Sequence, residues 1–278
     1  MASRAIIDLL SDNRTMDTHL EIDAIHGDPN FMNSLARGLA VIRGFSREKR
    51  HMSIAQLSHK TGIPRAAVRR CLYTLGRLGY VGTEDGRNFS LQPKLLGLGH
   101  AFLSSTPLVV AAQSFLDRVS DAVRESCSLG TLEGEDILYL ARSVTSRIIS
   151  VTLNVGSRLP AHCTSIGHVL LANLPEKDLQ AYLQTADLRG FTERTITSRH
   201  KLREQLEAVR AADYAIADQL MELQVRSIAV PVRNAAGRVV AGMNVIVQAG
   251  RVSLRDMRSL YLPQLQAAAR DLGAQLVA

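Results

Sequence analysis

The first third of the chain has apolar residues at helical spacing in three successive segments, and two short strand-like segments follow them. In the first segment, Leu35, Leu39 and Ile42 recur at helical spacing. Asn33 or Ser34 can cap this helix, because a short polar side chain accepts a hydrogen bond from an early backbone amide. We therefore predict a first helix that packs through its leucines.

The second segment has clear start and stop signals. Ser53 can cap a helix, and Gln56 three residues later completes a capping-box pattern. Gly62 stops the helix, because glycine tolerates a positive φ. Pro64 suits the first turn of the helix that follows. The sequence therefore predicts two helices joined by a tight turn.

The third helix has two chemically distinct sides. Its apolar side carries Val68, Cys71, Leu72, Leu75 and Leu78, and Gly79 ends it. The opposite side carries guanidinium groups and a phenol, which can bond guanine edges or phosphates. Tyr80 to Thr83 and Asn88 to Leu91 then read as two strands joined by an Asp85-Gly86 turn. We predict a winged helix-turn-helix whose DNA-contacting residues are Ser53, Arg65, Ala66, Arg69, Arg70, Tyr73, Arg77 and, at the tip of the hairpin, Arg87.

The charge distribution decides between this interpretation and an ordinary amphipathic helix with a solvated basic face. Residues 31–94 hold 12 basic and 3 acidic residues, a net charge of +9, whereas residues 1–30 have a net charge of −4. Residues 95–278 have a net charge of only +2. Positive charge is therefore concentrated in the helix-turn-helix segment, as a phosphate-binding module requires.

Length and composition limit the remaining classes of protein. A chain of 278 residues with 46% hydrophobic residues can form two domains with cores. It has no run of 18 apolar residues and no compact apolar signal region, so we expect a cytoplasmic protein and no membrane partner. Its three cysteines, Cys71, Cys127 and Cys163, are widely spaced without a Cys-x-x-Cys pair, which indicates reduced thiols rather than a metal site.

The rest of the chain mixes helical and strand-like patterns. We expect a mobile acidic extension over 1–30, the winged helix-turn-helix over 31–92, a helical linker with dimer contacts over 93–125, and a second folded domain over 126–278. Hairpin strands mixed with helices predict an α+β domain with a mainly antiparallel sheet. The expected strands are 137–141, 148–153, 227–232 and 239–247, and the expected helices are 108–124, 164–174, 176–183, a long helix capped by Ser198, and a final helix from Ser253 to about Val277.

Three sequence blocks carry a family resemblance. They are FMNSLARGLAVIRGF before the helix-turn-helix, GSRLPAHCTSIGHVLLANL, and DYAIADQLMELQVRSIAVPVRNAAGRVVAGMNV. With them the chain resembles the IclR family of bacterial transcription regulators over about residues 31–277. Within that family it is most similar to regulators of 4-hydroxybenzoate, protocatechuate and β-ketoadipate catabolism.

The resemblance implies that residues 126–278 form an effector-binding domain related to the GAF fold, in which a small acid lies beside the start of the helix at Thr164. Unpaired amides at a helix start suit a carboxylate. Arginines near the expected strands can pair with the same group. Arg158 is one such arginine. For Cys163 we expect a structural role or a place in the pocket wall. The expected effector-binding residues are Arg142, Arg147, Cys163, Thr164, Ser165, Ile166, Gly167, Ser227 and Asn244.

The chain departs from the family pattern at three positions. His168 stands where close relatives tend to have a basic residue. Leu220 and Gln224 replace an acid and a glycine in the segment LMELQV. These changes affect one expected wall of the pocket, so the effector can differ from that of a relative.

Catalytic chemistry finds little support in the sequence. His162 and Cys163 are adjacent, and in an extended strand they would point to opposite faces, so they would rarely share a proton. No P-loop, Gly-x-Ser-x-Gly or paired-carboxylate motif is present, and we expect no cofactor, no metal and no enzyme activity.

We therefore expect a ligand-responsive regulator that binds operator DNA and a small carboxylic acid, with RNA polymerase as a further candidate partner. It should bind further copies of itself as a homodimer or a dimer of dimers. Two alternatives remain open. One is an enzyme or small-acid carrier with an accessory DNA module, and the other is a constitutive architectural DNA binder.

Overall fold

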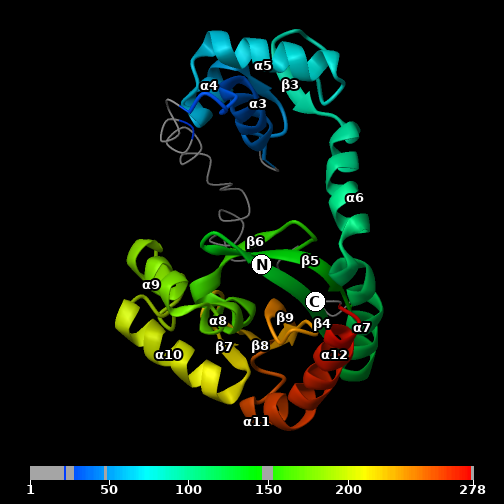
Figure 1. The fold of residues 1–278 in the computed structure, drawn as a ribbon, viewed down its shortest axis with the longest axis vertical. Helices are drawn as coiled ribbons and strands as arrows, with labels where there is room; N and C mark the ends of the chain where they lie inside the picture. The colour runs from blue at the N-terminus through cyan, green and yellow to red at the C-terminus, as the bar shows by residue number, and fades with distance from the viewer. Residues whose placement is uncertain (1–21, 23–27, 47–48, 146–152, 277–278) are drawn as a thin grey trace. The chain divides into compact units, whose positions relative to one another are not determined.

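The computed structural model describes residues 22, 28–46, 49–145 and 153–276 of the chain (Figure 1). They form two compact units, and the division between them lies between Phe102 and Leu103. The division falls inside one helix, α6, which spans Leu96–Ser105. α6 follows a short 3-10 turn, η1 (Pro93–Leu95), and none of its own residues is buried.

The first unit combines helices with a small antiparallel sheet of order β1-β3-β2. The predicted second and third helices and the two strands of the wing are confirmed, and β1 is an additional strand that pairs with β3. The elements are α3 (Asn33–Arg43), β1 (Met52–Ser53), α4 (Ile54–Thr61), α5 (Arg65–Arg77), β2 (Val81–Gly82) and β3 (Asn88–Leu91).

Local chemistry fixes the ends of α4 and α5. The Ser53 hydroxyl accepts a hydrogen bond from the Gln56 amide at 3.3 Å, and the Ser53 amide donates to Gln56 Oε1 at 2.8 Å, so the predicted capping box is present. Gly62 ends α4 with a φ of 71°. After α5, the Tyr80 amide donates to the Leu75 carbonyl at 2.9 Å across Gly79, whose φ is +80°. This is a Schellman-type ending, which glycine favours.

The packing face of α3 differs from the prediction. Leu35 and Leu39 are 58% and 52% exposed, whereas Ala40 and Val41 are buried. The helix packs on α4 and α5 through the adjacent side. The prediction failed because the spacing of apolar residues defines a stripe but does not tell which element covers it. The cap also differs, since the N-cap residue is Met32 rather than Asn33 or Ser34.

The rest of the core of the first unit agrees with the apolar side predicted for the third helix. Val68, Leu72 and Leu75 are buried, but Leu78 is 52% exposed because it lies beyond the last helical turn. The core also includes Ile22, which is 5% exposed. Most of the expected extension over 1–30 lies outside the described residues.

The second unit is built around a six-stranded sheet of order β6-β5-β4-β9-β8-β7, in which every neighbouring pair is antiparallel. The expected α+β class is confirmed. The elements are α7 (Pro107–Val123), β4 (Ser126–Glu133), β5 (Asp136–Ser143), β6 (Arg158–Pro160), η2 (Ala161–Cys163), α8 (Ser165–Ala172), α9 (Glu176–Thr185), α10 (Arg199–Ala212), β7 (Ala215–Asp218), β8 (Val225–Arg233), β9 (Val239–Gln248), α11 (Leu254–Asp256), a π-helical turn η3 (Met257–Tyr261) and α12 (Leu262–Ala274).

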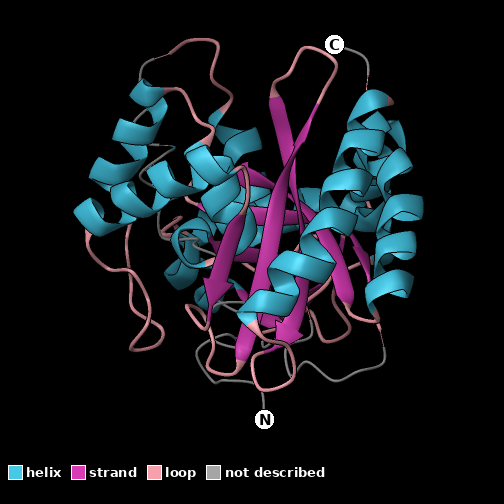
Figure 2. Cartoon of the chain, turned by 90° about the horizontal axis from the view of Figure 1, so that it is seen from below, coloured by secondary structure: helices cyan, strands magenta, loops and turns pink. Residues whose placement is uncertain are grey.

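Helices cover both faces of this sheet (Figure 2). One apolar cluster joins α7 and α12 to one face, and a second joins α8, α9 and α10 to the other. Glycine lets α8 approach closely, since a Cβ on Gly167 would lie 2.0 Å from the Ala161 carbonyl oxygen. The start of α8 is therefore pressed against the turn that precedes it.

For the second unit, one local prediction is wrong, one lies mostly outside the described residues, and some strands were missed. His162 and Cys163 lie in the 3-10 turn η2 rather than in an extended strand. Most of the expected strand 148–153 lies outside the described residues. β4, β6 and β7 were not predicted. β6 and β7 are short edge strands, and β4 begins with small and polar residues rather than with an apolar run.

No single helix of the described residues is long and apolar enough to cross a membrane. The consecutive helical segments Pro93–Ser105 and Pro107–Val123 meet the length and composition criteria only as a bent pair.

Candidate functional site

The outer face of α5 carries every residue that the sequence assigned to it. Its inner face is buried through Val68, Leu72 and Leu75, so the opposite side is presented to solvent. Tyr73 is 71% exposed. The exposed side chains of this face are Arg65, Ala66, Arg69, Arg70, Tyr73 and Arg77.

Two of the residues that we predict to contact DNA, Ser53 and Arg70, also have neighbours within the first unit. Ser53 is half-buried, and its backbone amide and hydroxyl are both engaged with Gln56, so its role includes fixing the start of α4. Arg70 borders a groove of about 440 Å³ between α3 and α5. Arg37 and Cys71 line the same groove. Burial raises the pKa of the Cys71 thiol, although both arginines oppose that effect.

The wing is organised by one carboxylate. Asp85 Oδ1 accepts hydrogen bonds from the amides of Arg87 at 2.8 Å and Asn88 at 2.7 Å. These bonds hold the pKa of Asp85 well below its usual range. Gly86 takes a φ of +68°, as the turn requires. Arg87 is therefore presented, exposed, by an ordered tip.

In the second unit, the start of α8 is capped from within. The Thr164 hydroxyl accepts a hydrogen bond from the Gly167 amide at 3.1 Å. The Gly167 amide, which the sequence leads us to expect beside the effector, therefore bonds to the Thr164 side chain here. The amides of Ser165 and Ile166 come before the first amide that bonds to a carbonyl within the helix. They are therefore the amides that this helix start can offer to a ligand. The Ser165 hydroxyl donates to Ser227 Oγ of β8 at 2.7 Å, which joins the helix start to the sheet.

Polar residues form a row across the sheet face that α8 covers. Ser128 on β4 pairs in register with Arg142 on β5 and with Asn244 on β9. Cys127 and Leu129 pack with α7 and α12 on the other face, so Ser128 points toward α8. Asn244 points the same way, because its neighbours Met243 and Val245 belong to that other cluster as well. We call Arg142, Ser128 and Asn244 the polar row.

The polar row has unused hydrogen-bonding capacity. Among the described residues, Ser128 Oγ, Asn244 Oδ1, and Nε and Nη1 of Arg142 are buried atoms without a hydrogen-bond partner. Burial lowers the pKa of Arg142, although that effect is opposed by Tyr139. The Arg142 guanidinium lies 5.2 Å from the centre of the Tyr139 ring. Such a row, beside two helix-start amides, can hold an anionic group.

The loop between β7 and β8 forms a wall near the start of α8. Met221 Sδ of this loop lies 3.1 Å from Cys163 Sγ. Gln219 and Gln224 at the loop ends have φ values of 63° and 66°, a left-handed conformation that glycine would adopt more easily. Position 224 therefore has a backbone conformation that suits the glycine of the family pattern, although it carries a glutamine.

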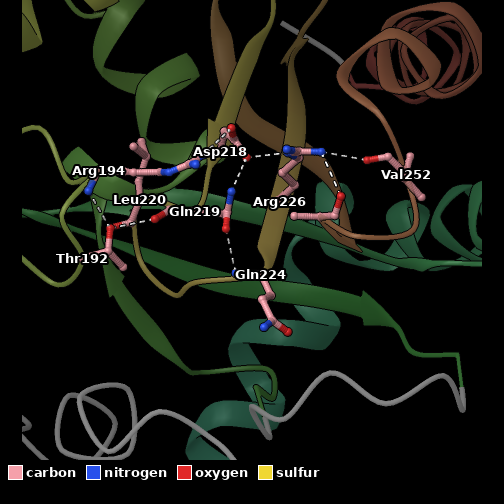
Figure 3. Close-up of polar contacts among 9 residues, drawn as sticks. Thr192, Arg194, Asp218, Gln219, Leu220, Gln224, Arg226 and Val252 are labelled. Atoms are coloured by element: carbon pink, nitrogen blue, oxygen red, sulfur yellow. Dashed lines mark hydrogen bonds and ion pairs between the residues drawn. The ribbon is translucent and has the colours of Figure 1, made fainter.

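A polar network ties down both ends of this wall (Figure 3). Asp218 binds Arg194 at 3.0 Å and also binds Arg226. Arg226 donates in addition to the Val252 carbonyl at 2.9 Å. The Thr192 hydroxyl donates to the Gln219 carbonyl at 2.7 Å. The loop is therefore held to the sheet and to the neighbouring turn at residues 192–195.

The histidines and cysteine near α8 are not arranged for nucleophilic chemistry. Cys163 is 1% exposed, and burial raises the pKa of its thiol. His162 Nε2 lies 3.0 Å from the Arg189 carbonyl, and His168 Nε2 lies 2.7 Å from the His162 carbonyl. Burial lowers the pKa of His168 to about 4, so this residue is a neutral core group at pH 7. Among the described residues, no group of three or more His, Cys, Asp or Glu side chains is placed to hold a metal ion.

The remaining sequence-assigned arginines are not part of the polar row. Arg147 lies outside the described residues. Arg158 on β6 forms an ion pair with Glu133. The sequence did not single out Ser128, Tyr139 or Met221, and the first two could have been found only from a strand alignment that places them beside Arg142.

Two family models match most of the chain. The IclR helix-turn-helix domain matches residues 34–85, and the bacterial transcriptional regulator IclR C-terminal model matches residues 100–274. The first match covers the three helices and β2 of the winged unit, and the second covers the six-stranded sheet with its helices.

Known proteins extend this similarity over almost the whole chain. The Pca regulon regulatory protein of Pseudomonas putida is 54% identical over 256 residues, which are 92% of this chain and 88% of that protein. A crystal structure from Rhodococcus sp. RHA1 has a TM-score of 0.78 at 43% identity and covers 88% of this chain and 98% of its own. The inducer-binding domain of a PobR double mutant from Acinetobacter, in complex with 3-hydroxybenzoic acid, has a TM-score of 0.57 at 34% identity and covers 59% and 97%.

Proposed function

Because the chain belongs to the IclR family of bacterial transcriptional regulators, we propose that it controls genes of aromatic-acid catabolism in response to a small carboxylic acid. The chain is a regulator and not an enzyme, as are its relatives. The proposed effector is an acid of the 4-hydroxybenzoate, protocatechuate or β-ketoadipate type. Its site lies between the start of α8 and the polar row.

The observation that carries the effector site is the set of buried polar atoms on Arg142 and Asn244. They face α8, and they have no hydrogen-bond partner among the described residues. Buried polar groups are normally bonded, so such a pair of residues marks a place where a polar ligand binds. The donors of Ser165 and Ile166 lie on the same side, because Ser165 contacts Ser227 beneath it. Cys163 and Thr164 lie directly before that helix and border the proposed site.

The proposed DNA contact uses α5 in the major groove and the wing beside it. Arg69, Arg70 and Tyr73 read base edges or bind phosphate, while Arg87 contacts the backbone or minor groove. The exposure of these side chains and the positive charge of the segment support this assignment.

A second copy of the chain is proposed as a partner. One short helix makes few base contacts, and paired half-sites multiply them. Exposed apolar side chains offer a surface for self-association on α3, through Leu35 and Leu39, and on α6, through Leu96 and Leu98. The dimer would act in the cytoplasm on operator DNA, where contact with RNA polymerase is a further proposed step.

Calorimetric titration with 4-hydroxybenzoate, protocatechuate and β-ketoadipate tests the effector site. Ser165→Pro removes one donor, and proline fits this first helical position after the extended Thr164. Ser165→Ala is the matched control, because it keeps the amide. Loss of one charge-assisted hydrogen bond costs about 1.5–3 kcal/mol, so Ser165→Pro should bind at least tenfold more weakly.

Asn244→Leu tests the opposite wall of the site in the same titration. It should also weaken binding of the acid while operator affinity is kept, because residue 244 lies outside the winged unit. Wild-type affinity in folded Ser165→Pro and Asn244→Leu variants would refute the site.

A further inference from the structure

A bulge in β5 places Tyr139 and Arg142 on the same face of the sheet. Leu129 pairs with Ala141 and the next residue, Gly130, pairs with Tyr139, so Leu140 is inserted between the two pairs. In a regular strand, residues three apart point to opposite faces. The extra residue reverses that relation, and Tyr139 packs in the cluster of α8 beneath the Arg142 guanidinium.

Tyr139 contacts both ends of the polar row. Its ring lies 5.2 Å from the Arg142 guanidinium carbon, which is a cation–π distance. Asn244 lies close enough to the Tyr139 hydroxyl to lower its pKa, although burial outweighs this effect and raises the pKa to about 12. Tyr139 is 2% exposed, so neither contact competes with bulk water.

Ser128 occupies the centre of the row. It pairs with Arg142 on one side and Asn244 on the other, so the three side chains stand at intervals of about 5 Å. Ser128 is fully buried, and its hydroxyl has no hydrogen-bond partner among the described residues. A buried hydroxyl between a guanidinium and an amide can donate to an oxyanion that both neighbours also bind.

We propose that Ser128 and Tyr139 complete the anion-binding floor of the effector site: Ser128 donates a hydrogen bond to the bound carboxylate, and Tyr139 positions Arg142 and Asn244 for it. This inference rests on the proposed function and assigns roles to two residues that the family resemblance did not single out. Ser128 touches the ligand, whereas Tyr139 acts through its two neighbours.

The test compares the tightest-binding acid of the panel with its neutral amide, using calorimetry on the full-length protein. Ser128→Ala should weaken binding of the acid about tenfold, equal to about 1.4 kcal/mol. Tyr139→Phe keeps the ring beneath Arg142, so it should weaken acid binding about threefold to tenfold through Asn244 and keep the preference for the acid over the amide. Tyr139→Leu removes the ring and should lower that preference about tenfold.

Ser120, a buried residue outside the polar row, serves as the matched control. Ser120→Ala removes a hydroxyl on α7. It should bind the acid within twofold of wild type. Far-UV circular dichroism and the thermal midpoint establish that each variant is folded.

The outcomes separate this inference from the proposed function. If wild type binds no acid of the panel, the proposed function fails and the inference fails with it. If wild type binds an acid but folded Ser128→Ala binds it equally well, Ser128 is not a ligand residue. Equal weakening of acid and amide in Tyr139→Leu would show that Tyr139 only supports the fold, which overturns its positioning role.

Discussion

Gln224→Gly should stabilise the second unit, although it removes a side chain. Gln224 has a φ of 66°, where a Cβ crowds the following carbonyl oxygen. The backbone contacts of the residue do not depend on the side chain: its amide donates to Gln219 Oε1 at 3.0 Å, and its carbonyl accepts from Ala249 at 2.7 Å. The side chain is exposed and extends away from the network (Figure 3).

The size of the effect follows from two opposing contributions to the free energy of unfolding. Relief of the left-handed conformation contributes about 1–2 kcal/mol. The greater freedom of glycine in the unfolded chain removes about 0.5–1 kcal/mol of that gain. The net stabilisation is therefore about 0.5–1 kcal/mol, which for a unit of this size raises the thermal midpoint by roughly 1–4 °C.

Differential scanning calorimetry of two further variants gives the comparison. Gln224→Ala keeps the Cβ and should not raise the midpoint. Gln219→Gly also relieves a left-handed residue, but it loses the side-chain bonds to Asp218 and to the Gln224 amide, so it should not stabilise either. If Gln224→Gly lowers the midpoint, or if Gln224→Ala raises it equally, strain at this position is not the reason.

Three further predictions concern DNA contact and the stability of the protein at low pH. Arg69→Ala or Arg70→Ala should cost about 1–3 kcal/mol of binding to a selected duplex in fluorescence anisotropy, and unchanged binding in both would exclude α5 as the reading helix. Arg87→Ala should weaken selected and random duplexes alike and reduce the salt slope by about one, so an unchanged slope argues against a phosphate contact by the wing. His168 has a pKa of about 4 when folded against 6.5 when exposed, so stability present above pH 6.5 should fall by up to about 3 kcal/mol as the pH drops to 4. His168→Gln should show a shallower decline in urea denaturation, and an identical decline would assign the effect to other groups.

The winged unit could be predicted largely from the sequence because its signals are local. The capping box of Ser53 and Gln56, the left-handed Gly62 and the Asp85-Gly86 turn each act within a few residues. The prediction failed for Leu35 and Leu39, since the spacing of apolar residues does not tell whether a stripe faces its own core or solvent.

The effector site could be predicted only in part, because it depends on strand register between distant segments. Asn244 is expected at the site from the family resemblance, and it lies buried on the face that α8 covers. Ser128 gave no such signal, since its importance comes from pairing with Arg142 and Asn244. The bulge at Leu140 is also invisible in the sequence, although it decides which way Tyr139 points.

The central claim is that binding of a small acid in the second unit changes DNA binding by the first. The most direct measurement is the affinity of the full-length protein for a duplex that it selects from random sequence, with and without a saturating concentration of its tightest-binding acid. Our account predicts at least about a fivefold change in Kd, with a reciprocal change in acid affinity when the duplex is present. Acid that binds tightly while both affinities stay unchanged would contradict it.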